Sequence, residues 1–219
     1  ILEQDIAISN IALDYIGQAR NFYQYAAELA GHGATEDSLA YLREVIDFKN
    51  CLLTELPNGD WAQTILRHFF FSTYQYFLYQ QLQNSSDAQL AAIAEKALKE
   101  VTYHVRWSSE WVIRLGDGTT ESKTRMLQAI DELWSYTGEL FEATGYELLA
   151  SRENYGVDMS IIQTDWHKKI NSVFEEATLS LPADIKMQWG GKEGRHTAHL
   201  QAILEEMQFL QRAHPGAEW

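Results

Sequence analysis

The chain has 219 residues, of which 46% are hydrophobic and 12% aromatic, so it can build an ordinary buried core and is not a disordered chain. Its formal net charge of −14 would repel a phosphate backbone, which argues against nucleic-acid binding. Cys51 is the only cysteine and no apolar run approaches the ~20 residues of a membrane span, so we expect a cytoplasmic protein without an intrachain disulfide.

Ala, Leu, Glu and Gln are abundant while strand patterns are scarce, and the sequence therefore predicts an all-α fold. Apolar residues recur at three- and four-residue steps over residues 1–30, which predicts a first helix that ends at Gly31. The pattern is already helical at Ile1, which is not Met, so we expect an N-terminal helix to be missing.

Two helices are expected next. Thr35 and Ser38 open one that runs to about Leu56, and another runs from Asp60 to about Gln83. The second of these is apolar on every face, which predicts a central, fully surrounded helix. The alternative is that one of its aromatic faces is an interface, since aromatic residues are enriched there.

The rest of the chain continues the helical pattern. Expected helices cover about 87–116 with Asp87 as cap, 121–143, 147–153, 159–179 with Asp158 or Ser160 as cap, and 196–214. Because the connections are short and no linker is visible, we predict a single domain over residues 1–219, an up-and-down bundle with additional helices packed outside.

The stretch KEVTYHVRWSSEW, residues 99–111, raises the question of a metal site. A di-iron bundle site takes a Glu from each of two helices and a Glu-x-x-His from each of two others. Here Tyr103 stands three residues after Glu100, and His104 follows at the fourth position. At about 100° per residue, both side chains lie on a flank of the apolar seam. We expect them to form a half-exposed, charge-assisted pair with each other.

A second Glu-x-x-His is missing from the sequence, since Asp14 is followed by Gly17 at the third position. Glu100, His104 and Asp14 are thus a degenerate set, and we expect neither a metal nor a catalytic residue in this chain. Two alternatives stay open: an autonomous di-iron oxidase that draws carboxylates from a missing N-terminal helix, and a helical small-molecule-binding module. His196 and His199, three residues apart, could also hold a stray zinc ion.

Three features are candidates for contacts with partners. Trp107 and Trp111 continue the flank of the helix that carries His104, and with His196 and His199 they are predicted to bind a partner. The stretch GGKEG, residues 190–194, is predicted to form a flexible loop. With Lys192 and Arg195 it is a hypothetical docking or CoA-phosphate surface, because backbone amides and a helix N-terminus can hold phosphate. A plain Gly-rich connector is the alternative, since the P-loop spacing is absent.

Four stretches stand in order at separations typical of one family: NIALDYIGQARNFYQYAAELAG, LLTELPNGDWAQTILRHFF, KEVTYHVRWSSEWVIRLGDGT and GGKEGRHTAHLQAILEEMQFLQRAHPGAEW. Over nearly its whole length the chain resembles the PaaC-type subunits of phenylacetyl-CoA 1,2-epoxidases. The resemblance implies a ferritin-like fold and a non-catalytic structural subunit without a cofactor of its own. One departure is Ala198, where the family reads His-Thr-Glu-His, so no role is carried over to that position.

The same resemblance implies the partners. A PaaA-type catalytic subunit would hold the di-iron centre and the substrate, and a small subunit and a flavin/iron–sulfur reductase would complete the system. The reaction would add one oxygen of O2 across the aromatic ring of phenylacetyl-CoA, with electrons from NADPH, in aerobic phenylacetate degradation. The isolated chain could also form a homo-oligomer.

Overall fold

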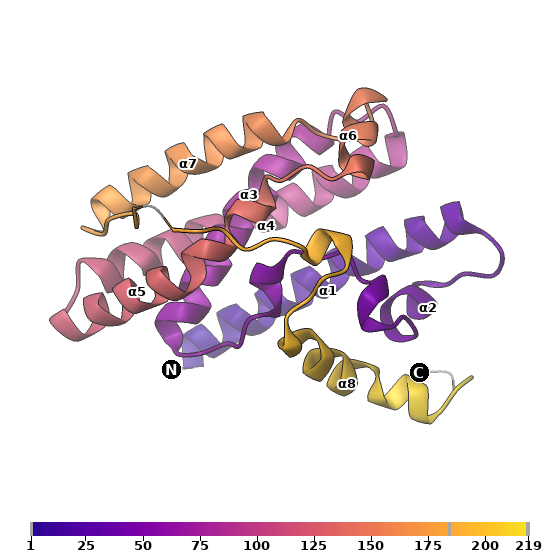
Figure 1. The fold of residues 1–219 in the computed structure, drawn as a ribbon, viewed down its shortest axis with the longest axis horizontal. Coiled ribbons are helices and arrows are strands. Elements are labelled where there is room, and N and C mark those ends of the chain that lie inside the picture. Colours follow the sequence, from indigo (N-terminus) through magenta and orange to yellow (C-terminus); the bar gives the residue numbers. More distant parts are fainter. Residues whose placement is uncertain (1, 184, 218–219) are drawn as a thin grey trace.

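The computed structural model describes residues 2–183 and 185–217, and within these ranges the chain forms helices and no strand, as predicted (Figure 1). The longer helices are α1 (Leu2–Ala30), α3 (Trp61–Leu82), α4 (Ala88–Gly116), α5 (Thr120–Leu133) and α7 (Met159–Glu176). The shorter ones are α2 (Glu36–Tyr41), α6 (Gly145–Arg152) and α8 (Ala198–Ala213). Single 3-10 turns are η1 (Val45–Asp47), η2 (Leu52–Glu55), η3 (Trp134–Tyr136), η4 (Gly138–Leu140) and η5 (Gly191–Glu193). The arrangement is consistent with a ferritin-like bundle.

The aromatic helix α3 lies at the centre of the bundle and packs against α4, α5 and α7. Its Phe69 and Phe70 are fully buried, and each contributes roughly 1.5–3 kcal/mol by leaving water. The carbonyl of Phe70 accepts a hydrogen bond from the Trp166 indole of α7 at 2.9 Å. The prediction of a central helix is therefore confirmed.

Local capping signals decide where most helices begin. The side chains of Thr35, Asp60, Asp87 and Asp158 each accept a hydrogen bond from a backbone N–H of the following first turn. These bonds satisfy donors that a helix start leaves without a partner, and each contributes about 1 kcal/mol. The predicted caps at Thr35 and Asp87 are confirmed, Asp158 is the cap of the two candidates offered for its helix, and Asp60 caps the helix predicted to begin there.

The second helix is much shorter than predicted. It begins after Thr35 but ends at Tyr41 instead of about Leu56. Arg43 is the reason, because its guanidinium bonds the carbonyls four residues before and four residues after it and lies over the Phe48 ring at 4.3 Å. These contacts fix a turn in place of a further helix.

The fifth helix also ends early, at Leu133 instead of about Ala143. The chain tightens there into η3 and η4, which places the Glu139 side chain inside the protein, 2% exposed. Its carboxylate accepts hydrogen bonds from the backbone N–H groups of Leu52, Gly190 and Gly191, each at 2.7 Å. Buried backbone donors that need a partner therefore override the helical pattern of this segment.

The predicted flexible loop 190–194 is a fixed part of the core. A Cβ on Gly191 would lie 2.3 Å from the carbonyl oxygen of Asn50, so only glycine fits there. Lys192 is buried, and its ammonium donates to the carbonyls of Leu140 and Glu142 and to the carboxylate of Glu147 at 3.0 Å. The prediction of a mobile connector is wrong because these bonds anchor it.

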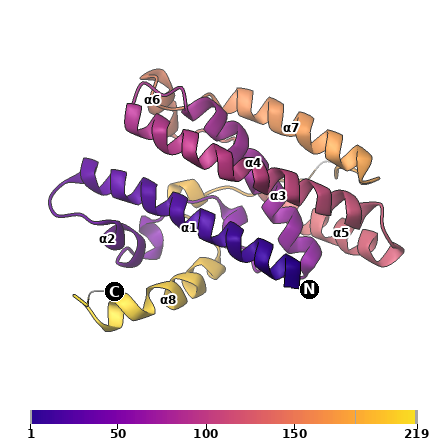
Figure 2. The same ribbon diagram turned by 180° about the vertical axis from the view of Figure 1, so that it is seen from behind.

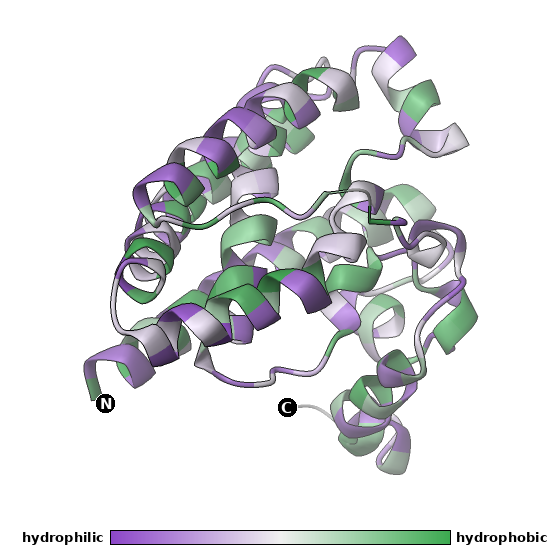
Figure 3. Ribbon diagram, turned by 60° about the vertical axis from the view of Figure 1, so that its left-hand side comes forward, coloured by the Kyte–Doolittle hydropathy of each residue, from purple (hydrophilic) through white to green (hydrophobic). Residues whose placement is uncertain are grey.

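The helix α8 stands apart from the bundle, below α1 and α2 in Figures 1 and 2 and at the lower right in Figure 3. It packs on α2, η1 and η2, with Leu200 and Leu204 against Phe48. In the described part of the chain, no helix has both the length and the apolar character that crossing a membrane would require.

Replacement of Glu139 by Gln should lower the free energy of unfolding by about 3 kcal/mol, because the new amide group would leave a buried backbone N–H without an acceptor. Urea denaturation at pH 7 measures this. Glu142→Gln, at an exposed neighbour, should stay within about 0.5 kcal/mol of the wild type. Equal effects of the two changes would contradict the role assigned to Glu139.

Candidate functional site

Two part-buried polar pairs tie α1 to α4. His104 Nε2 lies 2.9 Å from Asp14 Oδ2, and Gln18 Nε2 donates to Glu100 Oε2 at 2.9 Å. On each helix the two bonded residues are four positions apart. The residue number rises from Asp14 to Gln18 on α1 while it falls from His104 to Glu100 on α4. The two helices are therefore antiparallel here and meet through a polar seam.

The prediction that Glu100 and His104 form a half-exposed pair with each other is wrong. His104 is 0% exposed, and each residue of the pair bonds to α1 instead of to the other. Asp14, the third candidate, is brought to His104 as a hydrogen-bond partner. The angular positions of the apolar residues along α4 define the seam of that helix alone, so they do not reveal that α1 covers this flank of α4.

His68 of α3 extends the seam, although no carboxylate precedes it by three residues and the Glu-x-x-His pattern therefore does not reveal it. Its Nδ1 lies 3.3 Å from the Tyr15 hydroxyl, and its ring lies 5.5 Å from the His104 ring between centroids. Its Nε2 is buried without a hydrogen-bond partner in the described structure, as is Nδ1 of His104. A signal was present in its position on the most buried helix.

Burial sets the protonation of this cluster. Desolvation, together with smaller contributions from the neighbouring His104 and Arg67, lowers the pKa of His68 to about 3. Desolvation also lowers the pKa of His104, although the bond to Asp14 acts in the opposite direction. Burial raises the pKa of Tyr79 to about 12, and its hydroxyl donates to Gln18 at 3.3 Å. Neutral imidazoles and phenols at pH 7 make this a structural network with no strong acid or base.

The donor set does not fit a di-iron centre. Of the four side chains in the two pairs, Gln18 is an amide, which leaves two carboxylates and one imidazole with His68 nearby. Each carboxylate already accepts a hydrogen bond from the other helix. Among the described residues, no group of three or more His, Cys, Asp or Glu side chains is arranged to hold a metal ion.

Trp107 and Trp111 both meet another helix, and that helix is α3 of the same chain. Each packs edge-on against Trp61, with ring centroids 6.2 and 5.4 Å apart, respectively. The Trp111 indole also donates to Gln4 of α1 at 3.0 Å. Both side chains remain partly exposed, so their predicted contact with a partner stays a prediction.

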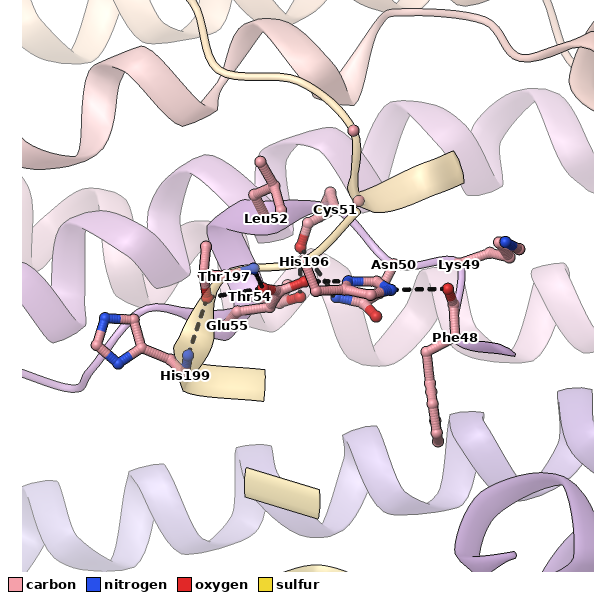
Figure 4. Close-up of polar contacts among 12 residues, drawn as sticks. Phe48, Lys49, Asn50, Cys51, Leu52, Thr54, Glu55, His196, Thr197 and His199 are labelled. Atoms are coloured by element: carbon pink, nitrogen blue, oxygen red, sulfur yellow. Dashed lines mark hydrogen bonds and ion pairs between the residues drawn. The ribbon is translucent and has the colours of Figure 1, made fainter. Parts of the chain in front are cut away.

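A buried carboxylate holds the start of α8, as Figure 4 shows. Glu55 is fully buried and accepts four hydrogen bonds, from His196 Nδ1 at 2.6 Å, from Asn50, and from the backbone and hydroxyl of Thr197. His196 Nε2 also lies 2.9 Å from the carbonyl oxygen of Phe48. The imidazole thus links the Glu55 carboxylate to the chain at Phe48 and holds the start of α8 against both.

The remaining candidates divide between interior and surface. His196 faces inward with a side chain 2% exposed, while the His199 ring points away from it (Figure 4), so the two do not share a zinc site. Lys192 is buried, which corrects its assignment to a surface for CoA phosphate. Arg195 is exposed and pairs with Glu193 at 2.7 Å. Glu55 and Glu139 were not predicted as buried anchors. Their only local signal in the sequence is a carboxylate placed among apolar residues.

Cys51 offers no nucleophile. Its thiol is buried, and desolvation together with the charge of Glu139 raises its pKa to about 11, so the thiolate is absent at pH 7. The described residues around η2 therefore provide anchoring groups and not a reactive side chain.

Comparison with known proteins adds a clear likeness. A family model described as "Phenylacetic acid catabolic protein" matches residues 1–219. A curated relative from Escherichia coli (strain K12), which is named as one of the subunits of 1,2-phenylacetyl-CoA epoxidase, is 47% identical over 218 residues. The match covers 100% of this chain and 88% of that relative.

The buried His68 should make stability fall in acid. Its folded pKa of about 3 lies below the ordinary 6.5, so unfolding takes up a proton between these values and stability is lost as the pH falls through this window. From pH 7 to pH 5 this costs about 2 kcal/mol. Urea denaturation at both pH values should show a pH dependence smaller by that amount in His68→Gln. His32→Gln, at an exposed histidine, should keep the wild-type dependence.

Removal of the His196 imidazole should loosen α8 while the central bundle persists. His196→Ala removes a hydrogen bond to the buried Glu55 carboxylate and another to the Phe48 carbonyl, at a cost of about 1–3 kcal/mol. Hydrogen–deuterium exchange should therefore accelerate in residues 45–56 and 196–213 more than in α3. His199→Ala, at an exposed side chain, is the control and should leave exchange unchanged. Uniform acceleration across the chain would contradict a local role.

Proposed function

Because the chain belongs to the phenylacetic acid catabolic protein family, we propose that it is the non-catalytic structural subunit of a multicomponent phenylacetyl-CoA 1,2-epoxidase. The complex would act in aerobic phenylacetate degradation. In it, this chain supports a second, catalytic subunit that holds the di-iron centre and binds the substrate. The relative from Escherichia coli, named as a component of that enzyme, supports the assignment.

The observation that carries the non-catalytic role is the polar seam between α1 and α4. Carboxylates and imidazoles stand in the interior of the bundle, but they bond in pairs across the two helices, His104 to Asp14 and Glu100 to Gln18. A di-iron site needs two Glu-x-x-His motifs and two further carboxylates with lone pairs free for metal. In this chain, side chains of the type that could bind metal instead form hydrogen bonds that hold α1 and α4 together.

The partners and cofactors follow from the same assignment. We expect no cofactor in this chain, and we expect di-iron in the catalytic subunit, with a small subunit and an NADPH-dependent reductase to complete the electron path. Trp107, Trp111 and the exposed His199 and Arg195 remain predicted contact residues within that assembly. We place the complex in the cytoplasm.

The alternative function is an autonomous di-iron oxidase. It would use Glu100 and His104 with carboxylates supplied partly by an N-terminal helix, and both side chains would have to leave their present hydrogen bonds to α1. Desolvation lowers the pKa of His104, which suits a ligand, but Gln18, the partner of Glu100, is an amide. The donor set therefore favours the structural role.

Reconstitution tests the proposal. The chain should co-purify with the catalytic subunit, and conversion of phenylacetyl-CoA to its ring epoxide should require both chains and the reductase. Iron analysis should find about two irons per pair of chains, none of them lost in Glu100→Gln, because this variant retains an acceptor for Gln18. Stoichiometric iron in the isolated chain, lost in Glu100→Gln, would instead establish the autonomous oxidase.

A further inference from the structure

A hollow of about 380 Å³ lies between α1, α3 and the segment that follows η2. Most of its wall is apolar and includes Ile8, Ile11, Ile65, Phe71 and Trp107. Sites for small molecules typically have a volume of roughly 300–1,000 Å³ and mainly apolar walls with a few polar groups. Since an apolar cavity of about 150 Å³ already accepts benzene, this hollow has room for a ring with a short side chain.

Arg67 of α3 brings a positive charge to the wall of this hollow. Its Nη1 donates to the carbonyls of Leu56 and Pro57, and its Nη2 donates to the side-chain oxygen of Asn58, so all of these acceptors are uncharged. In the described part of the chain, no carboxylate lies within ion-pair distance of the guanidinium. Partial burial lowers the pKa of Arg67, because its charge has lost water without gaining a counter-ion.

The Arg67 guanidinium still has donors to offer. Among the described residues, neither its Nε–H nor the second N–H of Nη2 has an acceptor. Neighbouring guanidinium nitrogens form the fork that a carboxylate accepts with both of its oxygens. The side chain is also partly exposed, so a ligand can reach it.

The other polar groups of the wall leave the selection to Arg67. The Tyr15 hydroxyl is bonded to His68, and the hydroxyls of Thr54 and Thr64 donate to backbone carbonyls. No Asp or Glu is among the described residues that line the hollow. The net charge of −14 is spread over the whole chain, and salt screens distant charges beyond about 8–10 Å. The local sign of the hollow is therefore positive.

We propose that this hollow binds a small monocarboxylate with an apolar body, such as an arylalkanoic acid, whose carboxylate pairs with Arg67 while its ring packs against Phe71 and Trp107. The ligand would supply the counter-ion that the guanidinium lacks and would bury the apolar wall. Because it binds the folded chain, it would also stabilise the chain by mass action. A supporting subunit would thus carry a ligand site of its own.

The same features argue against other small ligands. A neutral aromatic molecule would bury the apolar wall but would leave Arg67 desolvated without a counter-ion. Inorganic phosphate or acetate would pair with the guanidinium but would leave the apolar wall uncovered. A CoA ester has no carboxylate at its acyl end, so its ring could enter the hollow only without the ion pair.

Calorimetric titration of the full chain with phenylacetate at pH 7 tests the proposal. This acid is chosen because the proposed function concerns its CoA ester, while the site itself does not depend on that function. Saturable binding is expected. Phenylacetamide has the same size without the charge, and acetate has the charge without the ring, so each should bind more weakly by about tenfold or more.

Two variants place the ligand in the hollow. Arg67→Gln should weaken phenylacetate binding by about tenfold or more, whereas Arg106→Gln, at an exposed position on α4, should bind like the wild type. Because Arg67 also holds residues 56–58, a second variant leaves it in place. Ala12→Phe fills the hollow from an exposed position on α1 and should abolish binding, while Ala19→Phe, two turns further along α1 and outside this hollow, should not. Circular dichroism checks that each variant is folded.

NMR of isoleucine methyl groups then locates the ligand. Phenylacetate should shift the signals of Ile8, Ile11 and Ile65, which line the hollow, and leave that of the exposed Ile161 on α7 in place. The inference is overturned if the wild-type chain shows no saturable binding, if phenylacetamide binds as tightly as phenylacetate, or if Ala12→Phe binds like Ala19→Phe. Each of these results leaves the epoxidase assignment untouched, since reconstitution with the catalytic subunit decides that separately.

Discussion

Two buried carboxylates determine where the last part of the chain lies. Glu139 collects three backbone N–H groups from η2 and the 190–194 loop, and Glu55 collects the side chain and backbone at the start of α8. A buried charge is tolerated only when hydrogen bonds or a cation compensate for its loss of water. These bonds therefore connect segments that are distant in sequence and hold the loop and the start of α8 against η2.

The polar seam between α1 and α4 is also shaped by the cost of burying a charged group. His104 is buried completely, and its charge is avoided because desolvation keeps the imidazole neutral, while Asp14 remains partly exposed at the other end of the bond. Such a seam aligns two helices in one register, since a shift by one turn would separate both pairs at once. Each of these bonds uses one acceptor position of a carboxylate to hold the neighbouring helix, which links the packing of this bundle to a supporting role.

Local signals in the sequence account for what could be predicted. The caps at Asp60, Asp87 and Asp158 depend on a few neighbouring residues, and the burial of α3 depends on composition alone, so both can be read from a single chain. The ends of the second and fifth helices could not, because Arg43 and Glu139 choose partners that only the folded chain brings near. The predicted exposure of His104 was wrong for the same reason, because α1, which is distant in sequence, covers this flank of α4 in the folded chain. Lys192 was misplaced because a Gly-rich sequence resembles a surface loop even when its glycines are needed for close packing.

The orientation of α1 connects the fold to the assembly. An ordinary surface helix turns its apolar side inward and its polar side to water. In α1 the inner side carries Asp14 and Gln18, while Leu13 and Ile16 face outward and are each 65% exposed. Exposed in the isolated chain, these side chains contribute little to folding, whereas burial of each against another surface would contribute roughly 1.5–3 kcal/mol. Because α1 bonds inward through polar pairs, its large apolar side chains are left on the outer face, and the seam with α4 therefore determines what this surface presents.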